Sequence, residues 1–432
     1  MNRRAAALIA ASMLTVGFSG CSGNGDTIDT SDPGFVPSMD TNAQAVIDVN
    51  GSWSNFQALE SAAANWNKIY PNVEINYVKI DSYNSMLSKL TSGDNRPEIV
   101  MFDLSSYYEE KDSIISSLTD LSDIGLDLAA VNNSAVSSQT SDGKLCSLPW
   151  GVLATGFVAN TTLLESLGLE IPTTHDEMME TFQTLVDNGY TPVQGCTNGF
   201  YQNLMNNDMK YDVMHVEDYQ ALHDSLANVT AGCSSVFADE FTEMLELTEK
   251  NYVSAQINDS ISDNYEGNIL HFFEGNTPFL CFNTEGFSGM KKRESKSEKF
   301  TAEPFEYEFV ALPICTDEPT LSMGFLPGLS IVSGSENEEW AKEFLRFVCS
   351  SELNEMAEVK GVPTTAVSGE PDARFSHIGM ISGDMTVVPY EDVVSALSDE
   401  TFAFTLENIA EGNVTDLAGA YEFFENHLGG MR

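Results

Sequence analysis

Residues 45–102 read AVIDVNGSWSNFQALESAAANWNKIYPNVEINYVKIDSYNSMLSKLTSGDNRPEIVMF, which is the pattern of three β-strands separated by two α-helices. The strands are predicted at 45–49, 73–78 and 99–102, and the last is the continuous apolar run typical of a central parallel strand. Because crossovers between parallel strands are right-handed, the first strand is expected between the other two. The fold class is therefore α/β, and a ligand site is expected beyond the carboxyl ends of the first and third strands.

The two segments between these strands carry apolar residues at helical spacing. The first helix is expected to begin with Ser52 or Ser54 as its N-cap, and the second with Asp81 or Ser82. Gly93 is expected to end the second helix, because glycine readily adopts the left-handed conformation that closes a helix. The first two strands are thus each followed by a helix, as in a βαβ unit.

The N-terminus of the chain indicates export. The basic pair Arg3-Arg4 precedes an apolar stretch, residues 5–16, that is shorter than the ~20 residues a membrane-spanning helix needs. The following Phe18-Ser19-Gly20-Cys21 resembles the lipobox of bacterial lipoprotein signal peptides. That resemblance implies that residues 1–20 are a cleaved signal peptide and that Cys21 carries a lipid, which would place the protein outside the cytoplasm, anchored to the cell membrane. The alternative is an ordinary signal peptide with an incidental cysteine.

The segment after the signal peptide is polar. Residues 22–40 are rich in serine, glycine, asparagine, aspartate, threonine and proline, and bury too little apolar surface to offset their ordering entropy. Residues 21–40 are therefore predicted to be the lipidated cysteine and a flexible tether. The roughly 390 residues that remain are too many for one hydrophobic core, so two lobes are expected.

The charge of the chain excludes one class of partner. It has 20 Lys and Arg against 65 Asp and Glu, which gives a formal net charge of −45. Such a field repels phosphate backbones, so no nucleic-acid partner is expected. The basic cluster within residues 291–299 lies among serine and glutamate and is interpreted as a solvated loop.

No metal, cofactor or catalytic motif is evident. Six cysteines besides Cys21 lack the spacing of a zinc site: Cys146, Cys196, Cys233, Cys281, Cys315 and Cys349. An exported protein could pair these cysteines in disulfides, and Cys196 with Cys233 is the least implausible pair. Buried free thiols are the interpretation we favour. The HExxH, GxSxG, GxGxxG and Walker patterns are absent from the sequence.

Beyond residue 143 the chain alternates extended and helical patterns. Residues 144–160 are a bent extended run that is expected to cross between lobes. Two capping boxes, at 174–177 and 335–338, each precede an amphipathic helix, and Gly189 ends the first of these helices. Residues 278–283 and 308–312 are predicted strands.

Several stretches resemble the extracellular solute-binding proteins of carbohydrate ABC importers, the cluster that includes maltodextrin-binding proteins. The matching motifs cover about residues 45 to 430 in the family's order: DGKLCSLP at 142–149, FVANTTLLESLGL at 157–169, PTTHDE at 172–177, DNGYTP at 187–192, FFEGNTPF at 272–279, WAKEFLRF at 340–347 and GVPT at 361–364. Two departures imply a ligand other than maltodextrin. The family's small residue and tryptophan are replaced at 283–287, and one acidic sugar contact falls on Leu153.

The resemblance implies a two-lobed, periplasmic-binding-protein-like clamshell with type II-like sheets and several hinge crossings. It assigns residues 41–159 plus 278–328 to lobe one and 160–277 plus 329–432 to lobe two. It also implies a monomer without a cofactor, which binds a small-molecule sugar and delivers it to the transmembrane subunits of an ABC permease.

A sugar offers hydroxyl groups at its rim and apolar C–H groups on its faces, so its site needs aromatic rings and hydrogen-bonding side chains. Trp53, Asp103 and Tyr107 follow the first and third strands and are candidates for such contacts. Trp150, after Pro149, is a further candidate near the hinge. The alternatives are a hydrophobic staple for Trp53, an N-cap for Asp103 and a core position for Trp150.

Five more candidates lie further along the chain. Phe200 and Tyr201 occupy a segment where the family often has a ligand-stacking tryptophan, and one of the two is expected to be such a ring. Asn283 and Glu285 follow a strand end and are expected to face the cleft. Phe325 lies beside the last crossing, where packing of the hinge and contact with ligand are equally plausible.

Two other functions are weighed against a binding protein: a lipid-anchored glycoside hydrolase, and a surface lipoprotein that binds another protein. Abundant carboxylates are no evidence for hydrolysis, because with 65 of them some pair always lies at a glycosidase spacing. A protein that binds without catalysis is the function we favour, and no enzymatic activity is expected.

Overall fold

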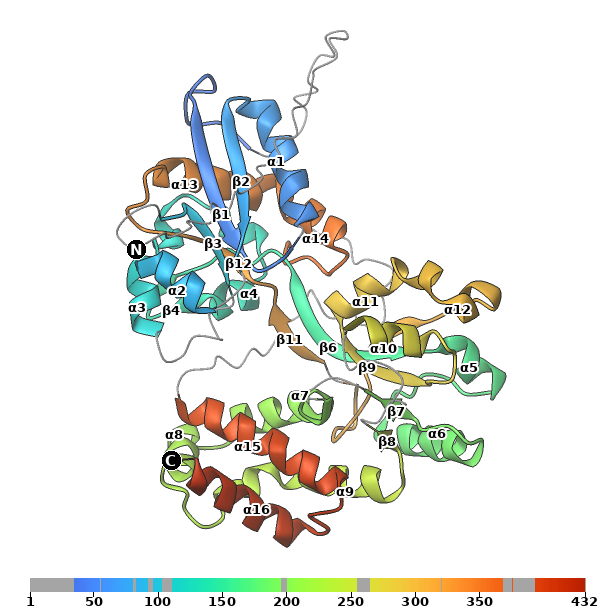
Figure 1. The fold of residues 1–432 in the computed structure, drawn as a ribbon. Coiled ribbons are helices and arrows are strands. Elements are labelled where there is room, and N and C mark those ends of the chain that lie inside the picture. Colours follow the sequence, from blue (N-terminus) through green and yellow to red (C-terminus); the bar gives the residue numbers. More distant parts are fainter. Residues whose placement is uncertain are drawn as a thin grey trace, which may run out of the picture.

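The chain folds into two lobes, each built around its own β-sheet (Figure 1). The description rests on a computed structural model. It describes residues 35–54, 56–80, 83–91, 96–102, 111–195, 200–254, 265–319, 321–367, 375 and 393–431. Within these residues no helix is both long and apolar enough to span a bilayer.

The sheet of the first lobe confirms the predicted strand order. Its strands follow the order β12-β3-β1-β2, with β1 parallel to both of its neighbours and β12 antiparallel to β3. Their bounds are Ala45–Gly51 for β1, Val73–Lys79 for β2, Ile99–Phe102 for β3 and Gly328–Ile331 for β12. The strand β1 therefore lies between β2 and β3, as right-handed crossovers require.

Helices surround this sheet (Figure 1). They are α1 (Gln57–Ile69), α2 (Tyr83–Thr91), α3 (Lys111–Ser117), α4 (Asn133–Ser138), α13 (Glu338–Phe347) and α14 (Leu353–Lys360), with the short pair β4 (Thr140–Ser141) and β5 (Lys144–Leu145). Helix α1 begins three residues later than Ser54, with Phe56 at the N-cap position and no side-chain cap. The expected serine cap was therefore wrong, and the fully buried Trp66 and Tyr70 show that packing holds this helix instead.

The second sheet has the order β10-β6-β9-β7-β8, and β11 also pairs with β6. Strand β6 is antiparallel to β9, β10 and β11, whereas β7 is parallel to β8 and β9. The bounds are Val152–Ala159 (β6), Val193–Gln194 (β7), Val253–Ser254 (β8), Phe279–Asn283 (β9), Glu308–Val310 (β10) and Ser322–Phe325 (β11). The predicted strands at 278–283 and 308–312 are thus β9 and β10.

Ten α-helices are described in the second lobe: α5 (Thr161–Ser166), α6 (His175–Asp187), α7 (Phe200–His215), α8 (Tyr219–Asn228), α9 (Ala238–Glu249), α10 (Tyr265–Phe272), α11 (Thr284–Lys291), α12 (Glu298–Ala302), α15 (Val393–Ala410) and α16 (Leu417–Gly430). The hydroxyl of Thr174 accepts a hydrogen bond from the Glu177 amide, so the predicted cap of α6 is confirmed. Helix α15 packs on α9 and α16, and Phe237, Phe241 and Phe402 fill the core between them.

The sheets divide the chain at other points than the resemblance implied. Strands β6, β9, β10 and β11 share the second sheet, so residues 152–159 and 279–325 belong to the second lobe. Strand β12 pairs with β3, and α14 packs against α1, so residues 328–360 belong to the first. The expected assignment of these segments was reversed, because motif order along a chain does not say which sheet a strand joins.

Three segments run together where the lobes meet. Leu148 and Leu329 exchange backbone hydrogen bonds of 2.9 and 3.1 Å, and the Leu326 amide donates to the Gly151 carbonyl at 2.9 Å. The Val152 amide donates to the Pro363 carbonyl at 2.8 Å. The expected crossing near residues 144–160 lies here, between β5 in the first lobe and β6 in the second (Figure 1).

Residues 35–40, expected to belong to the flexible tether, pack against the first lobe. The Phe35 ring contacts Phe347 edge-on at 5.4 Å between centroids, and the Ser38 amide donates to Glu343 at 2.7 Å. One aromatic residue in a polar stretch is enough to bury apolar surface, which the composition of residues 22–40 did not reveal.

Candidate functional site

The carboxyl ends of strands from both sheets meet beside the hinge. In the first lobe β1 ends at Gly51 and leads into Trp53. In the second lobe β9 ends at Asn283 and leads directly into α11. The side chains of Trp53 and Glu285 come into contact at this point, so the candidate site is formed by both lobes, at the strand ends where open α/β sheets bind ligands.

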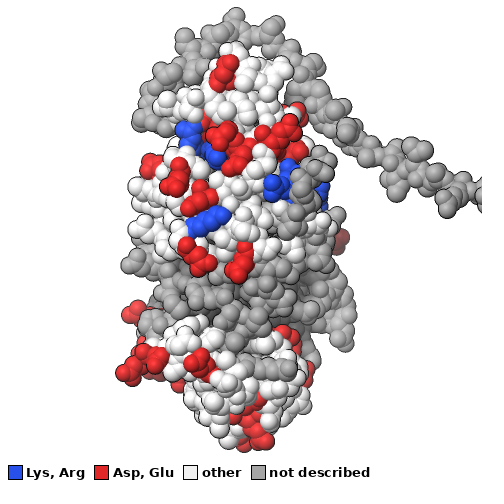
Figure 2. Space-filling view, turned by 90° about the vertical axis from the view of Figure 1, so that its left-hand side faces the viewer, with Lys and Arg blue, Asp and Glu red and all other residues white. Residues whose placement is uncertain are grey.

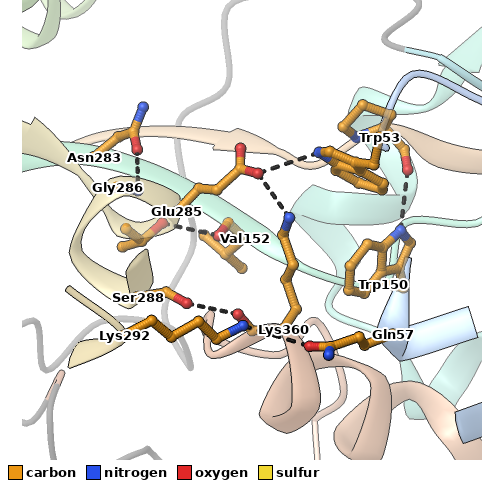
Figure 3. A network of polar contacts seen from close by, with 12 residues as sticks. Trp53, Gln57, Trp150, Val152, Asn283, Glu285, Gly286, Ser288, Lys292 and Lys360 are labelled. Atoms are coloured by element: carbon orange, nitrogen blue, oxygen red, sulfur yellow. Dashed lines mark hydrogen bonds and ion pairs between the residues drawn. The ribbon is translucent and has the colours of Figure 1, made fainter. Parts of the chain in front are cut away.

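Three side chains form the centre of the site (Figure 3). The Trp53 indole Nε1 donates a hydrogen bond to Glu285 Oε1 at 3.2 Å. Lys360 Nζ makes an ion pair with the same Oε1 at 2.7 Å, and it also lies over the Trp53 ring, 4.3 Å from the centroid. An aromatic face, a carboxylate and an ammonium group thus converge within hydrogen-bonding distance.

The loop that carries Trp53 is held from several sides. The Tyr77 hydroxyl donates to the Trp53 carbonyl at 3.0 Å, and the Trp53 ring contacts Phe56 and Trp150 at 4.7 and 5.9 Å between centroids. Burial raises the pKa of Tyr77, which therefore stays a neutral donor. A Cβ on Gly51 would lie 2.8 Å from the Tyr77 hydroxyl, so glycine permits this close approach. The position of Trp53 is therefore fixed before a ligand arrives.

Glu285 is positioned by the start of α11. The Asn283 side chain accepts a hydrogen bond from the Gly286 amide at 2.7 Å and so caps the helix. The Thr284 hydroxyl donates to the Val152 carbonyl and accepts from the Ala154 amide, both at 3.1 Å, which fastens the helix start to β6. The carboxylate of Glu285 lies in the first turn, where the helix dipole favours negative charge. Asn283 therefore orients Glu285, whatever further contact it makes.

Three other predicted site residues are buried. Trp150 is 0 % exposed and its Nε1 donates to the Pro327 carbonyl at 3.0 Å, so the ring packs inside the hinge. Phe325 is 9 % exposed within β11, and Phe200 is 3 % exposed at the start of α7. These placements favour packing, the alternative weighed for Trp150 and Phe325. They leave Tyr201 as the ring expected to stack at the start of α7.

The remaining predictions cannot be placed in the same way. Tyr201 belongs to the backbone of α7, but its side chain lies outside the described residues. Asp103, Tyr107 and the lipidation candidate Cys21 also lie outside them. Of the six body cysteines, Cys281 and Cys349 are buried free thiols, as we favoured, and Cys315 is a free thiol that is only partly buried. Burial raises the pKa of Cys281 to about 12.

Lys360 is the member of the site that the sequence did not reveal. It is the last residue of α14 and directly precedes Gly361, which closes the helix with a φ of 81°. The one available signal was its place beside the GVPT motif at 361–364, because that motif lies at the hinge: Val152 bonds to Pro363. A lysine at a helix end is otherwise read as a favourable charge for the helix dipole.

A second group of carboxylates lies in the core of the second lobe. Glu240 in α9 is fully buried, and neither of its oxygens has a hydrogen-bond partner among the described residues. Burial, with smaller contributions from nearby Asp212 and Asp208, raises its pKa to about 8. Among the described residues, no group of three or more His, Cys, Asp or Glu side chains is arranged to hold a metal ion.

Comparison with protein-family models gives one match. Residues 50–355 match the family described as bacterial extracellular solute-binding protein. The matched stretch runs from the end of β1 to α14 and so contains Trp53 and Glu285. A search of curated protein sequences finds no match.

Solved structures with the same fold cover nearly the whole chain. The sugar-binding protein MalE from Xanthomonas citri aligns with a TM-score of 0.69 and 15% identity, over 90% of this chain and 98% of its own. RafE from Streptococcus pneumoniae aligns with a TM-score of 0.67 and 16% identity, over 91% and 99%. The cyclic alpha-maltosyl-1,6-maltose binding protein from Arthrobacter globiformis aligns at 0.66 and 18%, over 90% and 100%. At these identities the similarity establishes the fold.

Proposed function

The chain belongs to the bacterial extracellular solute-binding proteins, and from this premise we propose that it captures a sugar or short oligosaccharide between its lobes. The closed, loaded form would then deliver the sugar to the membrane permease of an ABC importer. It performs no catalysis in this proposal.

The arrangement of Trp53 and Glu285 is the observation that carries the proposal. An aromatic ring matches the apolar C–H face of a sugar, and a carboxylate accepts hydrogen bonds from its hydroxyl groups. Trp53 comes from the first lobe and Glu285 from the second, and their contact at the junction of the lobes supports a role for both in binding. A ligand that reaches both side chains makes some of its contacts only in one arrangement of the lobes, so it shifts the protein toward that arrangement.

The ligands of similar proteins support this substrate class. The comparison structures include a binding protein for cyclic alpha-maltosyl-1,6-maltose, a RafE complex with raffinose and a sugar transporter complex with stachyose. These are neutral oligosaccharides of different linkage. From these sugars we infer the substrate class of this protein, and the titration below identifies the individual sugar.

The charge of the protein also favours a neutral ligand. The formal net charge is −45, and acidic side chains are spread over the face shown in Figure 2. A field of this sign disfavours polyanionic ligands such as sugar phosphates, while it leaves neutral sugars unaffected. Phosphorylated sugars are therefore expected to bind more weakly than the parent sugars.

A titration against a sugar panel tests the proposal. The purified protein is titrated with raffinose, stachyose, maltose and their phosphorylated counterparts, and binding is followed by calorimetry, thermal shift and small-angle scattering. At least one neutral sugar should raise the melting temperature and reduce the radius of gyration. Trp53→Ala should weaken that binding by about tenfold or more, because stacking and apolar area are both lost.

The matched control is Phe404→Ala, which removes an aromatic ring that is 39 % exposed on α15, away from the strand ends of the site. It should leave the affinity unchanged. Absence of binding and of compaction with every small solute would contradict the proposal. Release of reducing ends from oligosaccharides would instead favour a glycoside hydrolase, and a stable complex with another protein would favour a surface lipoprotein that binds another protein.

The proposal includes a lipid anchor at Cys21. It is supported by the lipobox-like residues 18–21 and by Phe35, which packs on the first lobe. Residues 22–34 would then connect the anchor to that lobe. Full-length protein expressed in a bacterial host should partition into detergent, and Cys21→Ser should move it to the aqueous phase; equal partitioning of both would contradict the anchor.

A further inference from the structure

The ion pair between Glu285 and Lys360 connects the two lobes. Glu285 lies in the first turn of α11, which packs on β6 and β9 of the second sheet. Lys360 ends α14, which packs on α1 of the first lobe. Any rotation that moves these helices apart must therefore break their 2.7 Å contact.

Two more contacts come from the same face of α11. The Ser288 hydroxyl donates to the Lys360 carbonyl at 2.6 Å, and Lys292 Nζ donates to Gln57 Oε1 at 3.4 Å (Figure 3). Lys292 directly follows α11 as its C-cap residue, and positions 285, 288 and 292 are three and four residues apart, so they lie along one side of the helix. We call these contacts of α11 with Gln57 and Lys360 the α11 interface.

Lys360 also covers the aromatic face that a sugar would need. Its ammonium group lies 4.3 Å from the centroid of the Trp53 ring, at the distance of a cation–π contact. Its side chain is 19 % exposed and that of Glu285 is 34 % exposed, so the pair is shielded from water only in part. A sugar ring stacked on this face would occupy the same space as the ammonium group. The two contacts are therefore mutually exclusive.

We propose that Lys360 is an internal competitor of the ligand: it covers Trp53 and, through Glu285, holds the lobes in their present arrangement until a sugar displaces it. The inference rests on the proposed function, because the competing ligand is the sugar proposed above. Contacts that a bound sugar must break lower its apparent affinity by the same factor by which they favour the arrangement in which they are formed. Removal of the Lys360 charge must then strengthen sugar binding.

The test uses Lys360→Met, which keeps most of the aliphatic stem and removes the ammonium group. Its matched control is Lys342→Met on α13 of the same lobe, where the lysine pairs with Glu338 and Glu339. Sugar affinity is measured by calorimetry with the tightest sugar of the panel. Lys360→Met should bind about three- to tenfold more tightly than the unmodified protein, and Lys342→Met should not differ from it.

A second measurement needs no ligand. Small-angle scattering and tryptophan fluorescence of the free protein should change in Lys360→Met, because the lobes are released and the indole environment is altered. They should stay constant in Lys342→Met. The double exchange Glu285→Lys with Lys360→Glu restores opposite charges, so its scattering profile should return toward that of the unmodified protein.

Each result decides the inference. Weaker sugar binding by Lys360→Met would make Lys360 a ligand contact and overturn the proposal. Unchanged affinity would overturn the competition with the sugar, and unchanged scattering would show that the α11 interface does not hold the lobes. If the unmodified protein binds no sugar at all, the proposed function fails, and the ligand-free scattering still shows whether Lys360 restrains the lobes.

Discussion

Glu240 shows what burial does to a single carboxyl group. Its side chain is fully buried, and its pKa is raised to about 8, chiefly because the interior disfavours the charged form. The unfolded chain releases this proton near 4.5, the ordinary value for glutamate. Between these two values the folded protein binds more protons than the unfolded chain, so the contribution of Glu240 to stability is lost as the pH rises.

Glu240→Gln is therefore expected to make the protein less sensitive to pH. The amide has the same shape and no charge, so the destabilisation between pH 4.5 and about 8 disappears. Relative to the unmodified protein, the free energy of unfolding of the variant should increase by about 2–4 kcal/mol between pH 5 and pH 8. Urea unfolding at both pH values measures the difference.

Glu249→Gln is the control, because Glu249 is exposed on the same helix. It should show the pH dependence of the unmodified protein. The same dependence in Glu240→Gln would mean that Glu240 is already ionised in the folded protein at pH 7.

Individual site residues were predictable only where chain geometry placed them. Trp53 and Glu285 follow the ends of recognisable strands, and strand ends converge on a ligand site. Lys360 ends a helix, and its one signal, the neighbouring GVPT motif, does not say that its side chain reaches across to the other lobe. Trp150 was ambiguous, because a tryptophan near a hinge packs the core as readily as it contacts a ligand.

At the scale of the element, two predicted capping boxes had different outcomes. In α6, Thr174 caps the helix and Glu177 accepts hydrogen bonds from the amide and the hydroxyl of Thr173. In α13, the N-cap is Asn337 without a side-chain bond, and Glu338 instead accepts from the Gly334 amide and the Thr119 hydroxyl. The capping box expected at 335–338 was therefore wrong, because Glu338 accepts a hydrogen bond from Thr119, in another part of the chain, instead of capping its own helix.

Thr174→Ala is expected to weaken the start of α6. The variant leaves the Glu177 amide without its acceptor, and loss of an N-cap typically costs about 1 kcal/mol. Thr174→Ser should restore most of the stability. The free energy of unfolding in urea is the measurement.

The matched control is Thr184→Ala in the same helix, whose hydroxyl only bonds back to the Glu180 carbonyl. Such a bond contributes little to a helix, and alanine has the higher helix propensity, so this variant should be neutral or slightly stabilising. Equal losses in both variants would show that the cap of α6 makes no specific contribution.

Elements with a clear period were predicted, and the two-residue strands were not. Strands β1 and β2 and helix α6 have enough residues to show a pattern. Strands β7 and β8 have only two residues each, and they exist because neighbouring strands supply their hydrogen bonds. A pattern in the sequence cannot report a strand of that length.

For the whole molecule, the sequence predicted two lobes but not which segments compose them. Total length and the order of motifs were sufficient for the first conclusion. The second depends on which sheet each strand enters after a crossing. Strand β12 returns to the first sheet because Gly328–Ile331 pairs with β3, a contact between residues more than 220 positions apart. Pairing over such distances leaves no local signal in the sequence.

The crossings themselves are tightly packed around Gly328. A Cβ at this position would lie 2.2 Å from Ser147 Oγ and 2.9 Å from the Leu148 carbonyl oxygen. Both neighbours belong to the segment that crosses between the lobes at residues 144–160. Leu148 and Leu329 also exchange two backbone hydrogen bonds. The segment around Gly328 can therefore lie against Ser147 and Leu148 only if residue 328 has no side chain. This close contact aligns the lobes.

Gly328→Ala is expected to destabilise the protein by about 1–3 kcal/mol, the usual cost of overpacking. It should also change the scattering profile of the free protein, because the two packed segments must separate.

Gly430→Ala near the end of α16 is the control. A Cβ there meets nothing within 4 Å, and alanine favours the helix, so the stability of this variant should stay equal or rise. Adding Ser147→Ala to Gly328→Ala removes the closer clash and should recover part of the loss, whereas the contact with the Leu148 backbone remains. If Gly328→Ala were as stable as Gly430→Ala, with an unchanged profile, the close approach at residue 328 would not determine how the lobes are aligned.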